Sequence, residues 1–509
     1  MLKAPIVGIH YQQLNLFFFF HCIDISSMRS TPFILFFFAF VFTACLDEEE
    51  YTTSANDFII SDVDTLRFDT VISGEPTNTY TFRMFNPASK SLRITEAYLE
   101  SGASSPFHVN IDGAVIEDGG TISLEVSKKD SLSVFLMANL PDVDEDEPQF
   151  VRDKLIVVTE GGARTEVVLE ASGQSVIKLR AQRISTDTNL SASRPYQVFD
   201  SLVVEEGSSL TLPAGTRLWM HPQAKLIVHG NLYCEGTAEN PVCIRGDRLG
   251  DMFNSQPYDR IPAQWGGIIV KRTGSAHINH TDIHSGTFGL YIEPNGDITT
   301  ERLRLENTIV HNMSGLCLEA EGSKLFVGNC QLTNGGAGCV SLRGGDATFV
   351  HCTIGRFYAF TGGSGAALTF TNADADGNAL PLIRADFLNS IVTGYSTDEV
   401  MAERAYADET AAFNFRFDHC LLDTDPVEDA SIANACLWDN KDAAVCREDN
   451  FAPAFDFTTL MFTFGLATES LAIGTADPAT TNAYYPLDLT GYPRGALPDM
   501  GCYQHRVQE

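Results

Sequence analysis

Ile278-Asn279-His280-Thr281-Asp282-Ile283 is the first of six copies of a short motif that decides the fold of this chain. Each copy has an apolar residue first, Asn or His third, Ser, Thr or Cys fourth, and an aliphatic residue sixth. The copies start 27, 22, 22, 38 and 30 residues apart, and the later ones are 305–310, 327–332, 349–354, 387–392 and 417–422. Repeats of roughly 20–30 residues centred on a strand indicate a solenoid.

The apolar residues of each copy change sides at the third position. They occupy one parity before the Asn or His and the opposite parity after it. Because the side chains of a strand alternate between its two faces, this change predicts a bend in the strand. A strand that bends at the same place in every repeat is typical of a parallel β-helix. The residues at the bend, named the corner column below, are His280, Asn307, Asn329, His351, Asn389 and His419.

The corner column is predicted to be structural. Side chains stacked at a bend can hydrogen-bond along the coil axis and satisfy the backbone groups of the corner. A zinc site needs ligands that converge, whereas the three histidines of the column do not fall in consecutive repeats. We therefore expect neither zinc nor catalysis at this column.

The flanking segments extend the predicted coil to residues 179–509. Strand-like runs separated by turns precede the motif, and Trp265-Gly266-Gly267 restarts the pattern after a long loop. Most of the run 198–422 resembles right-handed β-helix, pectin-lyase-like surface proteins. Residues 486–501 resemble the closing segment of the same proteins, with Arg494 and Asp499 as an expected structural pair.

Residues 56–178 alternate short strands with turns, which predicts a β-sandwich and an all-β chain. Phe85-Asn86-Pro87, followed by Leu92-Arg93-Ile94, resembles the immunoglobulin-like modules of bacterial surface proteins. No cysteine or tryptophan of this segment marks a true immunoglobulin domain. The acidic loop 142–147 is expected to be solvated, with calcium binding as the alternative.

The N-terminal region predicts where the protein is located. Residues 32–44 are an uncharged apolar run, too short to span a membrane and of the length of a signal-peptide core. The run ends at Cys45 after small residues, which resembles the lipobox of bacterial lipoproteins, and an ordinary signal peptide is the alternative. We expect an upstream mis-start at 1–27, a lipoprotein signal peptide at 28–44 and an acylated linker at 45–55.

Acidic residues 47–50 resemble the signal that exports Bacteroidota lipoproteins to the outer face of the outer membrane. This predicts a cell-surface protein held by a lipid anchor, with the periplasmic face as the alternative and a solvated linker as the plain interpretation. The whole chain is acidic, with 34 Lys and Arg against 66 Asp and Glu. Such a balance argues against a nucleic-acid partner and against docking on anionic lipid by charge.

The chain has twelve cysteines, and most are expected to be free. Cys330, Cys352 and Cys420 share one motif position, where small apolar side chains would stack. Cys436 with Cys446 is the favoured disulfide pair, and Cys234 with Cys243 is the second candidate.

Candidate sites outside the corner column are few. Asn372, Asp374 and Asp376 have the spacing of a calcium loop, but Ile383 stands at the twelfth position, and a hairpin turn explains the segment equally well. No other cofactor is expected. The column after the corner does not stack acids with a base, and neither Arg356 nor Arg384 has an assigned carboxylate cluster. We therefore predict no catalytic residue.

Two functions remain open at this point. The first is a surface-anchored, non-enzymatic lipoprotein whose β-helix binds a glycan or a surface protein. The alternative is a polysaccharide lyase or hydrolase that acts in an outer groove of the coil, beneath the loops 247–263 and 355–365. A groove holding acids beside Arg or Lys would favour the enzyme, and a flat or aromatic face would favour binding.

Overall fold

A computed structural model of the protein describes residues 49–253, 256–360, 363–405, 410–439, 445–460 and 462–506. The chain divides into two units between Tyr51 and Thr52, and the second unit, Thr52–Glu509, is compact. The predicted mis-start, the signal peptide and Cys45 lie outside the described residues. Within the described part, no helix has the length and apolar character needed to cross a bilayer.

The first part of the second unit consists of two five-stranded sheets that enclose one hydrophobic core. Buried and exposed residues alternate along strands such as β8, which places Val134 and Leu136 in that core. All pairings are antiparallel except that of β2 with β10, and the immunoglobulin-like assignment stays a prediction. One sheet has the order β1 (Ile60–Ser61), β3 (Tyr80–Phe85), β8 (Ser131–Ala138), β5 (Phe107–Ile111), β6 (Ala114–Val115); the other has β2 (Thr65–Ile72), β10 (Arg164–Gln174), β9 (Gln149–Thr159), β4 (Leu92–Leu99), β7 (Ile122–Val126).

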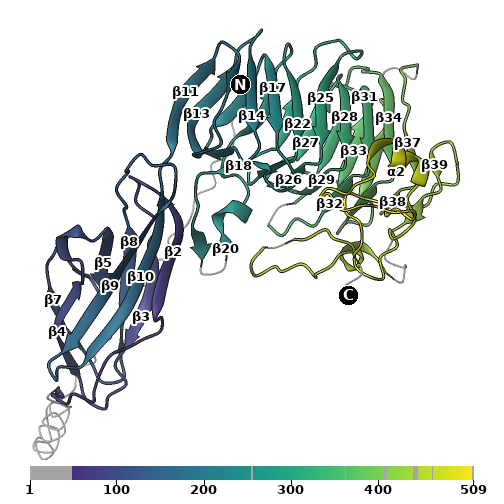
Figure 1. Ribbon diagram of the computed structural model, residues 1–509. Helices are drawn as coiled ribbons and strands as arrows, with labels where there is room; N and C mark the ends of the chain where they lie inside the picture. The colour runs from purple at the N-terminus through teal and green to yellow at the C-terminus, as the bar shows by residue number, and fades with distance from the viewer. Residues whose placement is uncertain are drawn as a thin grey trace, which may run out of the picture. The chain divides into compact units, whose positions relative to one another are not determined.

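The remainder is a coil of parallel strands that stack side by side from β11 to β40 (Figure 1). Each full turn contributes one strand to each of three parallel sheets, here named C, B and A in chain order. Sheet C contains β12 (Thr188–Asn189), β14 (Ser209–Pro213), β17 (Asn231–Glu235), β22 (Ser275–Asn279), β25 (Glu301–Glu306), β28 (Lys324–Gly328), β31 (Gly345–Val350), β34 (Leu382–Leu388), β37 (Arg416–Asp418) and β39 (Ala433–Asn434).

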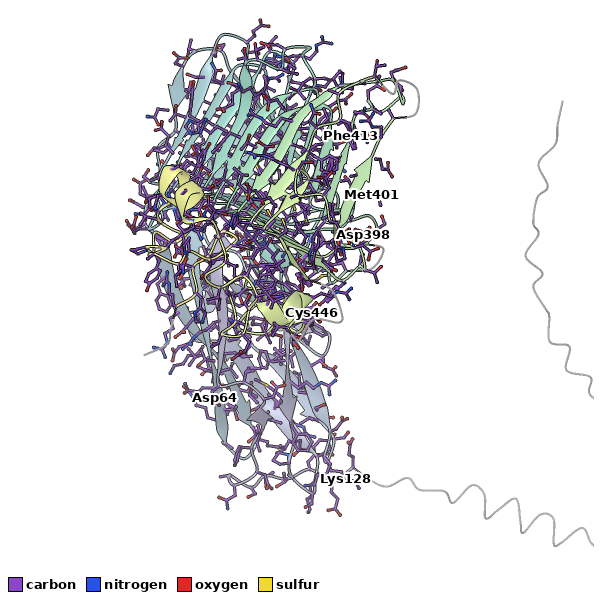
Figure 2. The ribbon with its side chains drawn as sticks, turned by 90° about the vertical axis from the view of Figure 1, so that its right-hand side faces the viewer. Asp64, Lys128, Asp398, Met401, Phe413 and Cys446 are labelled. Carbon is purple, nitrogen blue, oxygen red and sulfur yellow. The ribbon has the colours of Figure 1, made fainter. Side chains whose placement is uncertain are left out.

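Sheets B and A are joined through β13 (Tyr196–Val204), which pairs with β11 (Ile177–Ile184), β15 and β16. Sheet B contains β15 (Arg217–Met220), β18 (Val242–Gly246), β23 (Thr281–His284), β26 (Ile309–Met313), β29 (Gln331–Gly335), β32 (Thr353–Arg356), β35 (Ile391–Gly394), β38 (Leu421–Leu422) and β40 (Leu437–Trp438). Sheet A contains β16 (Lys225–Val228), β21 (Gly267–Val270), β24 (Leu290–Ile292), β27 (Leu318–Glu321), β30 (Val340–Arg343), β33 (Leu368–Thr371) and β36 (Val400–Glu403). Figure 2 shows Asp398, Met401 and Phe413 beside the last strands of this stack.

The interior of the coil is a continuous apolar core. Phe349, Phe387 and Phe417 stack on successive turns with ring centroids 4.9 Å apart at both contacts. Burying a side chain of this size stabilises the fold by about 1.5–3 kcal/mol. The ten cysteines of the described residues are all free, so neither predicted disulfide pair is formed there.

The last part of the chain, residues 445–506, covers the outer face of sheet B and is named the closing segment. A second apolar core lies between the two and includes Ile391 and Leu421 from the sheet and Phe464 and Met500 from the segment. The α-helix α2 (Pro478–Tyr484) of this segment starts at Asp477, whose carboxylate accepts from the backbone N–H of Thr480 at 2.9 Å. This capping contact satisfies an otherwise unpaired donor of the first turn.

The remaining short elements are β19 (Asp251–Phe253), β20 (Gln256–Pro257) and three 3-10 turns: η1 (Gly102–Ser104), η2 (Tyr258–Arg260) and η3 (Arg447–Asn450).

Candidate functional site

All six residues of the corner column lie between a strand of sheet C and the next strand of sheet B, in the left-handed backbone region. Their φ values run from 41° at His280 to 55° at Asn329. Asn tolerates this region better than most residues because its short polar side chain can bond locally. A left-handed residue turns the chain between the two sheets, which accounts for the change of parity in the motif. The column also continues beyond the motif, since Ala435 has a φ of 49°.

Side-chain amides bond along the axis at these corners. The Asn307 amide donates to Asn279 Oδ1 at 2.8 Å, and the Asn329 amide donates to Asn307 Oδ1 at 2.7 Å. Arg494 of the closing segment then donates to Asn329 Oδ1 at 2.8 Å. Its other acceptors are backbone carbonyls, including that of Asp499 at 3.2 Å, so the expected pair of Arg494 with Asp499 runs through the main chain.

His351 is fully buried between sheet B and the closing segment. Its Nδ1 lies 3.2 Å from the carbonyl oxygen of Gly501, which can only accept, so Nδ1 carries the proton. Nε2 is then the acceptor, and the Asn389 amide donates to it at 3.1 Å. Burial, with Arg494 nearby, holds the pKa of His351 well below its usual range, which keeps the ring neutral. Both ring nitrogens are therefore used in hydrogen bonds within the structure.

A second asparagine column, absent from the sequence interpretation, lies at the end of the sheet B strands. Asn312 and Asn334 have φ values of 53° and 57°, and the Asn334 amide donates to Asn312 Oδ1 at 3.4 Å. Asn334 Oδ1 accepts from the backbone N–H of Phe357 at 3.1 Å. The signal was the placement of both asparagines five residues after a corner residue, Asn307 or Asn329.

Asp282, His284 and His311 form a cluster of metal-ligating side chains on sheet B. The strand register places His284 of β23 directly beside His311 of β26. Asp282 Oδ1 lies 3.0 Å from His284 Nδ1 and 3.2 Å from His311 Nε2. One ligand atom from each residue falls within 4.8 Å of the others. This is the one such group of three among the described residues.

The charges of this cluster are set by burial and mutual contact. Burial alone would raise the pKa of the Asp282 carboxyl, but the two imidazoles hold it well below its usual range. Burial lowers the pKa of His284, against the attraction of Asp282. Asp282 belongs to the column after the corner, for which the sequence predicts no catalytic residue. An alignment of the motif copies places His311 beside His284, because each histidine directly follows the last residue of its copy.

A cavity of about 170 Å³ reaches this cluster at His311. Its other lining residues are Arg260, Asn312, Thr333, Asn334, Leu460 and Phe462. Arg260 is held by a hydrogen bond from Nη1 to the carbonyl oxygen of Thr459 at 2.8 Å. The cavity therefore combines amide, hydroxyl and guanidinium groups with an apolar wall from the closing segment.

Three buried carboxylates lie near the far end of sheet B. Glu399, Asp423 and Asp439 each have no exposed surface. Arg356 Nη1 is 3.8 Å from Glu399, and Arg447 Nε is 3.2 Å from Asp423. No carboxylate cluster was assigned to Arg356 from the sequence, and Glu399, the acid that lies near it, belongs to a loop outside the motif. Arg384 also has a partner, Asp346 at 2.7 Å.

These carboxylates are engaged by the chain itself. Glu399 accepts from the backbone N–H groups of Ala367 and Ser396, at 2.6 and 2.7 Å. Asp439 accepts from Thr393 Oγ1 at 2.6 Å. Burial raises the pKa of all three acids, and that of Asp423 to about 7. They brace the loops around sheet B rather than line an open groove.

The three calcium candidates are engaged in separate hydrogen bonds. Asn372 is fully buried, and its Oδ1 accepts from the backbone N–H of Ala405 at 2.6 Å. Asp374 accepts from the backbone N–H groups of Asp376 and Asn378, which closes a turn. Calcium binding at Asn372, Asp374 and Asp376 stays a prediction.

The outer face of sheet C carries a row of large side chains in register. Tyr233, His277, Arg304 and Phe326 are successive neighbours on β17, β22, β25 and β28. The Arg304 guanidinium lies 4.5 Å from the centre of the Phe326 ring, and Tyr484 of α2 stacks on that ring at 6.0 Å. Tyr484 is 48% exposed. We name these five residues the aromatic row.

A groove of about 600 Å³ borders this sheet at the corner column. Tyr485 lines the groove and donates to Glu306 Oε1 of sheet C at 2.7 Å. The other lining residues are Gly236, Thr237, Ala238, Glu239, Asn279, His280, Asn307, Pro486, Leu487, Asp488 and Gly491. The groove therefore offers amides, carboxylates and apolar groups beside the aromatic row.

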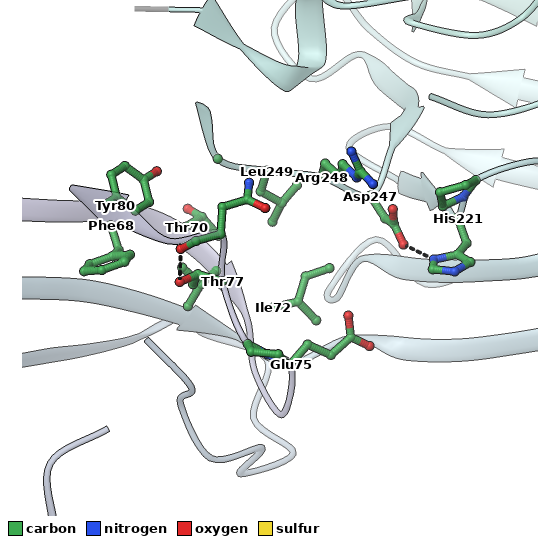
Figure 3. A pocket seen from close by; sticks show the side chains of 15 residues that line it. Phe68, Thr70, Ile72, Glu75, Thr77, Tyr80, His221, Asp247, Arg248 and Leu249 are labelled. Atoms are coloured by element: carbon green, nitrogen blue, oxygen red, sulfur yellow. Dashed lines mark hydrogen bonds and ion pairs between the residues drawn. The ribbon is translucent and has the colours of Figure 1, made fainter. Parts of the chain in front are cut away.

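A further pocket of about 240 Å³ is lined by residues that include Glu75, Tyr80, His221, Asp247 and Arg248 (Figure 3). Within it, His221 Nδ1 lies 2.7 Å from Asp247 Oδ2. This contact links two turns of the coil.

Comparison with known proteins supports the coil. A family model for the right handed beta helix region matches residues 259–386, so this part of the chain is a right-handed β-helix, as predicted. No curated protein matches the chain.

Three solved structures show low similarity. The first is a family 123 glycoside hydrolase from Clostridium perfringens, at 10% identity over 23% of this chain and 26% of that chain, with a TM-score of 0.16. The chain thus spans about a quarter of that enzyme. The second is the PapD-like domain 7 of human CEP192, at 16% identity over 26% and 94%, with a TM-score of 0.16. The third is BcpA, the major pilin subunit of Bacillus cereus, at 12% identity over 26% and 43%, with a TM-score of 0.14. We draw no functional conclusion from them.

Proposed function

We propose that the protein is a non-enzymatic lipoprotein of the outer cell surface that binds a glycan on sheet C of its β-helix. The observation that carries the binding function is the aromatic row. Aromatic faces with charged neighbours suit sugars, which present apolar ring faces and hydroxyl groups. Successive side chains of the row lie about 4.8 Å apart along the axis, so an extended chain could contact several of them.

The alternative, a polysaccharide-degrading enzyme, has less support from the geometry. Its groove was expected on the outer face of the coil beneath the loops 247–263 and 355–365. Much of sheet B is covered there by the closing segment, and Gln331, Thr353, Ile391 and Leu421 are buried. The acids Glu399, Asp423 and Asp439 are buried as well, whereas a glycosidase needs two carboxyl groups that reach the bond to be cleaved.

The test uses a panel of neutral and acidic polysaccharides, each assayed for binding by calorimetry and for cleavage by chromatography. We expect binding without cleavage, and a loss of at least about tenfold in affinity for the combined variant Phe326→Ala and Tyr484→Ala, because aromatic side chains that the ligand covers dominate binding energy. The control is Phe135→Ala, which removes an exposed ring of the first domain. Release of shorter products would establish the enzyme, and equal affinity of the combined variant would rule out the aromatic row.

A partner protein is the other ligand class for this surface. If no polysaccharide of the panel binds, glycan recognition is wrong and a search for protein partners follows. The lipid anchor and the cell-surface location are a separate part of the proposal. They are supported by the resemblance of Cys45 and its flanking residues to a lipobox, and they have their own test.

A further inference from the structure

We propose that Asp282, His284 and His311 form a binding site for a divalent transition metal ion of the zinc class. Asp282 and His284 alternate along β23, so both project from the same side of sheet B. The core-facing residue between them is Ile283, which is fully buried. His311 occupies the adjacent position on β26. The three side chains therefore reach one point from two neighbouring strands, which are rigid elements of the coil.

The ligand types suit such an ion. Two imidazoles and one carboxylate bind zinc at about 2.0–2.2 Å from each ligand atom. In a tetrahedral arrangement, ligand atoms at that range are separated by about 3.3 Å. The Asp282 oxygen already lies 3.0 and 3.2 Å from the two ring nitrogens. An ion would take the place of the N–H protons that now join the carboxylate to the rings.

The surroundings match a three-ligand site. Trp265 Nε1 donates to the carbonyl oxygen of His284 at 2.8 Å and so fixes the backbone of that ligand. His284 has a side-chain exposure of only 7%, whereas that of Asp282 is 35% and that of His311 is 23%, so an ion can enter past these two. The adjoining cavity at His311 is lined by Arg260 and leaves room for water or a small anion. Three protein ligands with an open position are typical of zinc sites that bind a further ligand.

The test titrates the full chain, stripped with a chelator, with zinc chloride. We expect one equivalent to bind by calorimetry and the unfolding temperature to rise, since an ion that binds only the folded state stabilises it. Asp282→Asn and His311→Gln should each weaken zinc binding at least about tenfold. His221→Gln is the matched control, because His221 is an exposed histidine of the coil beside the carboxylate of Asp247. Absence of stoichiometric binding by the wild type, or unchanged affinity in His311→Gln, would overturn the site.

A second measurement needs no variant and remains decisive if a variant fails to fold. Crystals of the wild-type chain soaked in zinc chloride are measured at the zinc absorption edge. The anomalous peak is expected within about 2.2 Å of Asp282 Oδ1, His284 Nδ1 and His311 Nε2. A peak elsewhere, or none, contradicts the proposal. The outcome is independent of glycan binding, because the aromatic row lies on sheet C.

Discussion

Buried polar side chains of the coil obtain their partners from the closing segment. Arg494 is 1% exposed and donates to Asn329 and to the backbone of Asp499 and Gly501. Burial lowers its pKa to about 10, so the guanidinium remains charged at neutral pH. A buried charge without acceptors is strongly unfavourable. The buried guanidinium of Arg494 therefore needs both the carbonyl groups of the closing segment and the side-chain oxygen of Asn329 as acceptors.

Asp423 is predicted to make stability fall as the pH rises. Burial raises its pKa to about 7, and Asp439 and Glu399 act in the same direction against Arg447. The unfolded carboxyl titrates near 3.9, so its stabilising contribution is complete below about pH 4 and is lost as the pH approaches about 7. Asp423→Asn removes this titration, and the fall in unfolding temperature between pH 4 and 7 should become smaller than in the wild type.

Thermal unfolding at pH 4, 5.5 and 7 measures this difference. Asp425→Asn, an exposed acid two residues away, serves as the control and should follow the wild type. An Asp423→Asn profile that parallels the wild type would show that Asp423 titrates normally in the folded chain.

The closing segment and sheet B meet at a contact where only glycine fits. Gly501 has a φ of +84°, and a Cβ there would lie 2.7 Å from Thr353 Oγ1 and 2.8 Å from Ile391 Cδ1. Gly495, in the same segment, has a φ of +68° with no atom within 4 Å of its Cβ position. The two positions therefore share a backbone penalty and differ in crowding.

Gly501→Ala is predicted to destabilise the protein more than Gly495→Ala. The left-handed backbone costs each variant about 1–2 kcal/mol, and overpacking adds about 1–3 kcal/mol at Gly501 alone. Urea unfolding gives both free energies, and limited proteolysis should cleave the segment faster in Gly501→Ala. Equal free energies of unfolding for the two variants would mean that the segment does not pack on Thr353 and Ile391.

The elements that follow a local rule were predictable, and those that depend on loops were not. The corner at Asn307 was visible because a left-handed residue reverses the parity of the apolar pattern. The contact of His284 with His311 follows from the same motif register. Glu399 and Asp423 come together through loops of unequal length, for which no periodicity exists. The closing segment, which covers sheet B, has no repeat either, so the burial of Ile391 could not be predicted from the sequence.

We propose that a lipid attached to Cys45 anchors the whole chain to the membrane. Intact cells treated with protease should lose the protein, because the export-like acidic residues 47–50 resemble a signal for the outer face of the outer membrane. Cys45→Ala should move the protein from the membrane fraction to the soluble fraction, since acyl chains provide the anchoring energy. A periplasmic protein that survives the treatment is the control. Survival of the wild-type chain would contradict surface exposure.

The corner column keeps the strands of successive turns in register while the loops vary in length. Asn329 bonds to Asn307 across 22 residues of sequence, and Asn389 bonds to His351 across 38. The extra residues of the longer turn lie before and after β33, and β33 and β34 pair in parallel with β30 and β31 of the preceding turn. Insertions at such places alter the surface without disturbing the register of later turns. Evolution can therefore graft new recognition loops onto this scaffold one turn at a time, and protein engineers can use the same positions to display foreign peptides.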